Sequence, residues 1–281
     1  MESMIDVIRG RVSVRTYSEQ AIEPEKRQKM HDLLKSETKG PFGNTVRFAM
    51  IDLSEVEKNE VKSLGTYGFI SGAKVYIVSA VKGSSGAMED LGHCFEKVVL
   101  GATRLGLGTC WMGGTFNRAS FARRIDVSED EVVPAISPIG YARDRRAVRE
   151  RLIRSLAGSD RRKSWEQLFF DGDMNTPLAR DAAGDYGSAL DCVRLAPSAS
   201  NRQPWRIVKQ SAPSVFHFHL RRTPGYDRFT ARIDLQRVDM GIAMCHFETA
   251  VRDLHLSGRW VVAKPNLETG NAEYVVSWAE S

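Results

Sequence analysis

One amphipathic pattern occurs twice in this 281-residue chain, and this repetition limits the possible folds more than any other feature. The segments that begin at Asp90 and Asp239 both start Asp-apolar-Gly, and each reaches a tryptophan, Trp111 or Trp260, at the same spacing. Between these landmarks the apolar residues advance by four, three, four and three positions in both segments. Such spacing lines one face of a helix, so the sequence predicts two similar amphipathic helices.

Strand-like runs surround both predicted helices. We expect strands before the helices at 47–53, 75–80, 206–210 and 215–221, strands after them at 131–136 and 273–278, and a short helix at 188–195. The chain is therefore predicted to be α+β, with two tandem units over residues 1–157 and 158–281, each a mixed β-sheet flanked by helices. Similar tandem units suggest a homodimer joined into one polypeptide and packed as an intramolecular pseudo-dimer. The alternative is a coincidence between two unrelated core helices.

Composition excludes several classes of protein. Hydrophobic residues make up 42% of the chain and charged residues 27%, which is typical of a globular protein. The longest apolar runs are broken by Lys74 and Arg104, and the N-terminus lacks the apolar core of a signal peptide, so we expect no membrane segment. The four cysteines lie far apart without a C-x-x-C pair, which favours free thiols in the cytoplasm and argues against zinc.

The net charge of +5 is concentrated between Arg143 and Lys163, where nine Lys and Arg residues face three acids. We interpret this stretch as a solvated connector, with a small-anion site or a nucleic-acid patch as alternatives, and we expect no nucleic-acid partner. His217 and His219 share one face of a predicted half-exposed strand. They have no evident third ligand, so we expect no metal.

Two polar clusters carry the chemistry of the sequence. In the first, Arg11, Ser13 and Arg15 alternate along an extended segment, which puts two guanidinium groups and a hydroxyl on one side. Guanidinium groups match phosphate oxygens, although R-x-S-x-R is also a common surface pattern. The second is the loop at 196–206, APSASNRQPWR, whose Ser, Asn and Gln side chains suit the edge of a polar planar heterocycle or simply a capped turn.

Together these clusters resemble motifs of the FMN-dependent nitroreductase family. The first resembles its flavin-phosphate motif, and PSASNRQPW at 197–205 is similar to its P-S-x-x-N-x-Q-P-W loop. The run GATRLGLGTCW at 101–111 resembles its helix end, and Ile139–Tyr141 and 161–166 resemble two further family segments. The resemblance extends over most of the chain and implies the fused, double-unit branch of the family.

One departure from the family pattern carries information. The position of the P-S loop in the first unit holds Lys39–Arg47 without the motif, and the second unit begins without an Arg-x-Ser-x-Arg triplet. Family members build each flavin site from both subunits of a dimer. A fused chain would then keep one complete site, with its phosphate end from the first unit and its loop from the second, and would bind one FMN.

The resemblance also implies which residues hold the cofactor. Arg11, Ser13 and Arg15, joined by Arg162, would hold the phosphate and ribityl end, while the loop would lie along the isoalloxazine and main-chain donors near Trp111 would face its reactive N5. Trp111 is equally expected as a core residue, and Gln203 is expected to support the loop. The predicted cofactor-binding residues are Arg11, Val12, Ser13, Arg15, Trp111, Met112, Gly113, Gly114, Arg162, Pro197, Ser198, Ala199, Ser200, Asn201 and Gln203.

The resemblance implies an oxidoreductase in which NAD(P)H reduces FMN and a nitroaromatic, quinone or similar acceptor then reoxidises it, in a ping-pong cycle. The catalytic chemistry would belong to FMN and not to a protein nucleophile. Segments 54–72 and 222–236 would line the acceptor pocket, and the chain would act as a monomer. The alternative is a non-catalytic flavin-binding, sensor or interaction protein, and nucleic-acid binding through residues 143–163 is a weaker third hypothesis.

Overall fold

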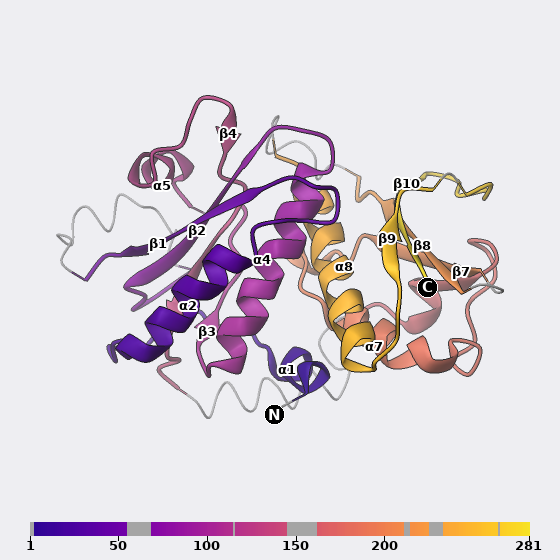
Figure 1. Ribbon diagram of the computed structural model, residues 1–281, viewed down its shortest axis with the longest axis horizontal. Coiled ribbons are helices and arrows are strands. Elements are labelled where there is room, and N and C mark those ends of the chain that lie inside the picture. Colours follow the sequence, from indigo (N-terminus) through magenta and orange to yellow (C-terminus); the bar gives the residue numbers. More distant parts are fainter. Residues whose placement is uncertain are drawn as a thin grey trace.

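The computed structural model describes residues 3–54, 69–114, 116–144, 162–210, 214–224, 233–263 and 265–281. Two long helices, α4 (Ala87–Arg104) and α8 (Leu235–Asp253), pack side by side between two β-sheets (Figure 1). Both helices predicted from the repeat are confirmed, although each begins a few residues before its Asp-x-Gly landmark. The α+β class is also confirmed. Among the described residues, no helix is both long enough and apolar enough to cross a membrane.

The first sheet has the strand order β1-β2-β5-β3, with β4 paired to β2 beside this path. Its strands, which pair antiparallel, are β1 (Val46–Asp52), β2 (Val75–Lys82), β3 (Gly108–Thr109), β4 (Glu131–Val132) and β5 (Ile136–Gly140). The continuous strand predicted over 131–136 is wrong, because pairing stops after Val132 and resumes at Ile136. Between them lies Pro134, which has no N–H to donate to a ladder.

Two helices accompany the first sheet. Helix α2 (Pro24–Ser36) begins with a proline in its first turn and packs against β1 and α4. Helix α5 (Arg118–Arg124) begins after Asn117, whose side chain accepts a hydrogen bond from the Ser120 N–H.

The second sheet has the order β6-β7-β8-β10-β9 and is mixed, because β6 pairs parallel to β7 while the other pairs are antiparallel. Its strands are β6 (Phe169–Asp171), β7 (Trp205–Gln210), β8 (Val215–Arg221), β9 (Arg259–Val261) and β10 (Ala272–Ala279). Helix α7 (Gly187–Leu195) packs against α8, and 3₁₀ turns lie at η1 (Trp165–Gln167), η2 (Gly184–Tyr186) and η3 (Ala199–Asn201).

The prediction that β8 is half exposed is wrong. His217 and His219 are both buried on this strand. His217 Nδ1 lies 2.7 Å from the Ser277 hydroxyl, and its Nε2 lies 2.9 Å from Gln210 Oε1. The neighbouring strands thus supply hydrogen-bond partners that make burial of this histidine tolerable.

Helix α1 (Met4–Gly10) joins the N-terminus to the helices of the second half of the chain. It packs against α7 and α8, and the Ser3 hydroxyl and Ile5 N–H both donate to Asp253 at the end of α8, at 2.6 and 3.1 Å. This docking brings the segment after α1, which begins at Arg11, to the boundary between the two sheets.

Both sheets and the helix pair contribute to one apolar core, which includes Ile77 on β2, Phe95 on α4, Phe218 on β8 and Phe247 on α8. The boundary predicted between residues 157 and 158 lies outside the described residues, as does most of the basic stretch at 143–163.

Candidate functional site

A cleft of about 1380 Å³ lies where the N-terminal segment, α8 and the loop before β7 meet. Ligand pockets typically measure about 300–1,000 Å³, so this cleft is large enough for a cofactor together with a small substrate. All of the predicted site residues line it except Val12 and Gln203. Residues separated by almost two hundred positions in the sequence therefore line one cleft.

The segment after α1 is extended and alternates as predicted. Val14 N–H donates to the Thr109 carbonyl at 2.9 Å, and Ser13 forms a parallel bridge to Thr109 at the edge of the first sheet. Val14 is buried and Val12 packs against the same apolar cluster, while the side chains on either side of them line the cleft. Alternation thus sorts this segment into an apolar face and a face that carries two arginines.

The two arginines of this segment have different surroundings. The Arg11 side chain is only 6% exposed, and its Nε lies 3.8 Å from Glu96 Oε1. Among the described residues this buried Nε finds no hydrogen-bond acceptor. Arg15 is exposed at the same wall of the cleft. A buried cation whose polar atoms are incompletely paired is costly, so Arg11 is suited to receive an anion.

The loop that connects α7 to β7 has a strained backbone. Ser200, Asn201 and Gln203 have positive φ angles of 47°, 56° and 48°. Strained residues of this kind persist where surrounding contacts hold them, and they cluster at functional sites. Gln203 N–H donates to Ser198 Oγ at 2.9 Å, and Gln203 Oε1 accepts from Lys163 N–H at 2.9 Å. Gln203 therefore supports the loop from behind, outside the cleft.

Asp239, the repeat landmark in α8, anchors this loop by accepting from the Ala199 N–H at 2.9 Å. Its other oxygen has no partner among the described residues, and complete burial raises the pKa of this carboxyl well above its usual range. Asp90 is its repeat counterpart and anchors the loop at 40–44 through three bonds, from Phe42 N–H, Asn44 N–H and Asn44 Nδ2, at 2.8–2.9 Å. Equivalent aspartates thus hold two loops of different sequence.

The residues after β3 also line the cleft. The Trp111 ring packs at a tilt against Phe95, with 4.7 Å between the ring centroids, and it also lines the cleft. Trp111 is therefore both a core residue and a residue of the cleft. Gly113 lies against Leu235 at the start of α8, and a Cβ at Gly113 would come within 2.7 Å of the Leu235 side chain. The main chain can approach Leu235 this closely because residue 113 has no side chain. Arg118 donates to the Gly113 carbonyl at 2.6 Å and fixes this turn.

Arg162 also lines the cleft, and its guanidinium group forms hydrogen bonds to the main chain. It donates to the carbonyls of Ala196 and Leu195 at 2.6 and 2.9 Å, at the end of α7. Arg162 therefore fixes the start of the loop as well as adding positive charge beside it.

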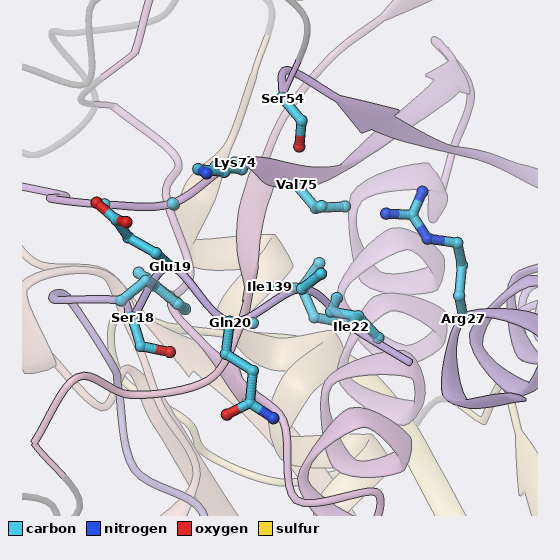
Figure 2. Close-up of a pocket in the computed structure, with 14 residues that line it drawn as sticks. Ser18, Glu19, Gln20, Ile22, Arg27, Ser54, Lys74, Val75 and Ile139 are labelled. Carbon is cyan, nitrogen blue, oxygen red and sulfur yellow. The ribbon is translucent and has the colours of Figure 1, made fainter. Parts of the chain in front are cut away.

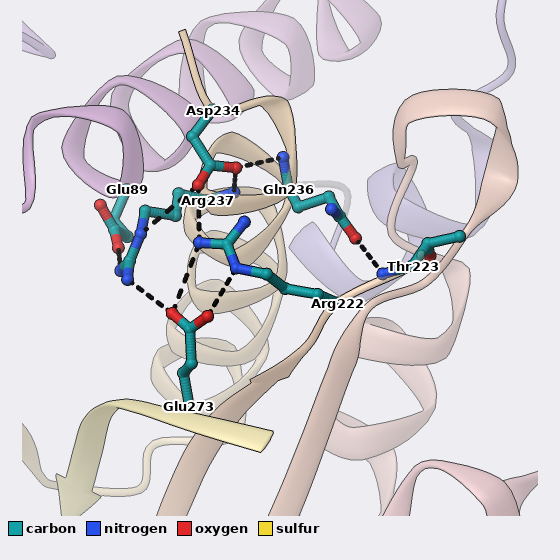
Figure 3. Close-up of polar contacts among 7 residues, drawn as sticks. All are labelled: Glu89, Arg222, Thr223, Asp234, Gln236, Arg237 and Glu273. Atoms are coloured by element: carbon teal, nitrogen blue, oxygen red, sulfur yellow. Dashed lines mark hydrogen bonds and ion pairs between the residues drawn. The ribbon is translucent and has the colours of Figure 1, made fainter. Parts of the chain in front are cut away.

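Arg222, Asp234 and Arg237, which line the cleft, belong to a network of charged side chains (Figure 3). Arg222 contacts Glu273 at 2.5 Å and Asp234 at 2.8 Å, and Arg237 contacts Glu89 at 2.6 Å and Glu273 at 2.8 Å. Burial raises the pKa of Glu89, while the carboxylates of Asp234 and Glu273 raise the pKa of Arg222. The network joins α4 to α8 and β10, and it fixes both described ends of the segment at 222–236.

Several residues of this cleft were missed at the sequence level. Arg118, Arg222, Asp234, Gln236 and Arg237 line it without belonging to any short motif. The expected acceptor segment 222–236 included three of them, Arg222, Asp234 and Gln236, and its described ends do line the cleft. For segment 54–72, most residues lie outside the described part of the chain. No sequence signal marks Arg118.

A smaller cavity of about 80 Å³ lies between the N-terminal segment and the first sheet (Figure 2). Glu19, Lys74 and Arg27 contribute charges to its wall, and Arg27 is paired with Asp52 at 2.5 Å. Its volume corresponds to a few water molecules and not to an organic cofactor. The large cleft is therefore the candidate site.

This chain was compared with protein-family models, curated proteins and solved structures. The family model described as "Putative TM nitroreductase" matches residues 3–251. The crystal structure of a "putative nitroreductase" from Thermotoga maritima covers 99% of this chain and 93% of its own, with 21% identity and a TM-score of 0.59. An FMN-dependent nitroreductase from Clostridium difficile covers 50% of this chain and 89% of its own, with 20% identity and a TM-score of 0.41. No curated protein matches this chain.

Proposed function

Because this chain belongs to the nitroreductase family whose model matches residues 3–251, we propose that it is an FMN-dependent oxidoreductase. It would transfer a hydride from NAD(P)H, by way of FMN, to a nitroaromatic, quinone or similar small acceptor. The observation that carries the proposal is the cleft itself. One wall presents Arg11, Ser13 and Arg15, and the other presents the loop at 197–201.

The residues of the cleft fit an FMN molecule. Arg11 lines the cleft with a largely buried side chain, and Arg15 adds a second positive charge for a phosphate of nearly two negative charges. The loop at 197–201 supplies hydroxyl, amide and main-chain groups, which suit a heterocycle with donors and acceptors on one edge. The glycines Gly113 and Gly114 leave room for a flat ring against the main chain.

Bound FMN would supply the redox chemistry, by accepting a hydride and passing reducing equivalents to the acceptor. The chain's own residues then bind, orient and stabilise. Arg11 and Arg15 hold the anionic end, while hydrogen bonds from the Ala199 N–H to Asp239 and from the Gln203 N–H to Ser198 keep the strained loop in place. Main-chain N–H groups fixed in advance stabilise developing charge without reorganising during the reaction.

We also infer that the chain consists of two equivalent units, split near residue 157, and that it acts as a monomer with one flavin site. Three features support this inference. Helices α4 and α8 follow the same apolar spacing and pack together, and Asp90 and Asp239 anchor equivalent loops. The loop at 40–44 lacks the P-S motif and is fully engaged with Asp90. Light scattering should then give a mass near 31.4 kDa.

The visible spectrum of freshly purified protein tests the flavin proposal first. About one FMN per chain is expected, and the Arg11→Ala/Arg15→Ala double variant should lose the flavin and NAD(P)H-dependent reductase activity together. Arg259→Ala, which removes an exposed arginine outside the cleft, is the matched control. An active enzyme should give parallel lines in two-substrate kinetics.

Two other outcomes would count against this proposal. Flavin bound stoichiometrically without any NAD(P)H oxidation would favour a non-catalytic flavin-binding or sensor protein. Failure to bind FMN even in excess would overturn the reductase altogether.

A further inference from the structure

Glu96 is a buried carboxylate at the contact between α4 and α8, and it has three partners from distant parts of the chain. Its Oε2 accepts from Trp111 Nε1 at 2.6 Å, and its Oε1 lies 2.9 Å from His246 Nε2 and 3.8 Å from Arg11 Nε. The Glu96 and His246 side chains are inaccessible to solvent. Two of these partners, Arg11 and Trp111, line the cleft, whereas Glu96 itself does not.

The hydrogen bonds fix how charge is distributed in this cluster. His246 Nδ1 lies 2.8 Å from the Cys192 carbonyl, which can only accept, so Nδ1 carries a proton. One further proton must lie between His246 Nε2 and Glu96 Oε1. Whichever atom holds this proton, the Glu96–His246 pair has no net charge. The positive charge of Arg11 therefore remains available for an anion in the cleft.

We propose that Glu96 is a positioning residue, which holds the Arg11 guanidinium group and the Trp111 indole at the cleft so that Arg11 meets the phosphate of the flavin. This role rests on the proposed flavin function. Arginine loses much side-chain rotamer entropy when it is ordered, and holding it in place before the ligand arrives removes part of that cost from binding. Glu96 would thus act on the phosphate end of the ligand without touching the ligand.

The chain contains a natural control for this role in Glu248. Its Oε2 lies 2.7 Å from His93 Nε2 and accepts from Trp260 Nε1 at 3.0 Å, so it also joins the two helices through a histidine and a tryptophan. Its third partner is Arg252, whose side chain is 64% exposed, in place of Arg11. None of these four residues lines the cleft. Loss of the Glu248 carboxylate should disturb the helix pair but not the phosphate end.

The Glu96→Gln variant separates position from charge. A glutamine can accept from Trp111 with its oxygen and donate to His246 Nε2 with its nitrogen, and the proton that Glu96 and His246 shared is then absent. The pair stays neutral before and after the change, so the net charge near the phosphate does not alter. Only the ion pair that orients Arg11 is lost, and a fall in affinity therefore reports on position.

The test measures the dissociation constants of FMN and riboflavin by flavin fluorescence for the unsubstituted chain, E96Q, E248Q, R11A and the E96Q/R11A double variant. We expect E96Q to weaken FMN about tenfold and riboflavin less than twofold, because riboflavin has no phosphate. E248Q should change neither. In the R11A background, E96Q should have no further effect, since the group that it positions is already gone.

Three results would overturn the positioning role. E96Q could bind FMN as the unsubstituted chain does, it could weaken both flavins equally, or it could add its full effect to that of R11A. Thermal melting of E96Q beside E248Q checks that both variants fold. If the unsubstituted chain binds neither flavin, the proposed function falls and this inference falls with it, whereas tight FMN binding that is indifferent to E96Q rejects the positioning role alone.

Discussion

Gly92 of α4 and Gly241 of α8 occupy equivalent positions of the repeat, and they face each other where the two helices cross. A Cβ on Gly92 would overlap the carbonyl oxygen of Val238, and a Cβ on Gly241 would overlap the carbonyl oxygen of Glu89. Both neighbours are main-chain atoms in helices, so neither can turn aside. The closeness of the helix pair therefore depends on glycine at both positions.

Alanine at either glycine should push the helices apart. We expect Gly241→Ala and Gly92→Ala each to lower the free energy of unfolding by about 3 kcal/mol, the upper part of the usual range for overpacking. Urea denaturation would measure the loss. Gly10→Ala is the control, since a Cβ there meets nothing within 4 Å. Unchanged stability of the two variants would mean that the helices are not in close contact in solution.

The two landmark aspartates should respond differently to the same substitution. Burial raises the pKa of Asp239 well above its usual range, and one of its oxygens has no partner among the described residues. Asparagine can still accept from Ala199, so Asp239→Asn should cost less than about 1 kcal/mol. Both oxygens of Asp90 accept hydrogen bonds from N–H groups. Asparagine at this position would turn its own NH₂ group toward one of these N–H donors. Asp90→Asn should cost about 1–3 kcal/mol in chemical denaturation. Equal losses would contradict this difference in hydrogen bonding between the two aspartates.

Stability should fall in acid because of His219. Burial lowers the pKa of His219 from 6.5 to about 4. Between these values the unfolded chain binds the proton and the folded chain does not. The contribution of His219 is therefore complete above pH 6.5 and is lost as the pH falls toward 4, by up to about 3 kcal/mol.

Denaturation of His219→Phe at several pH values would test this origin. The variant should show a shallower decline of stability between pH 6.5 and 4, while His255→Asn, which replaces an exposed histidine, should keep the original slope. A parallel decline in the unsubstituted chain and in His219→Phe would assign the acid sensitivity to other groups.

Local patterns predicted the parts of this fold that depend on local order. Apolar spacing located α4 and α8, and strand-like runs located β1, β2, β7, β8 and β10 close to their observed bounds. The break before Ile136 was missed because the apolar run continues across Pro134. The burial of His217 and His219 was missed because it depends on Gln210 and Ser277, which neighbouring strands bring to one of them.

The sequence by itself determined the helix repeat, the alternating arginines after α1 and the polar loop before β7, since each rests on contacts within a few residues. Only the tertiary structure decided that these segments share one cleft, because the docking of α1 on α7 and α8 places Arg11 in the cleft that the loop also lines. It also decided that Asp239 holds the loop and that Glu96 contacts Arg11. Such contacts join residues that are far apart in the sequence. They depend on how whole elements pack, so the spacing of residues along the chain does not predict them.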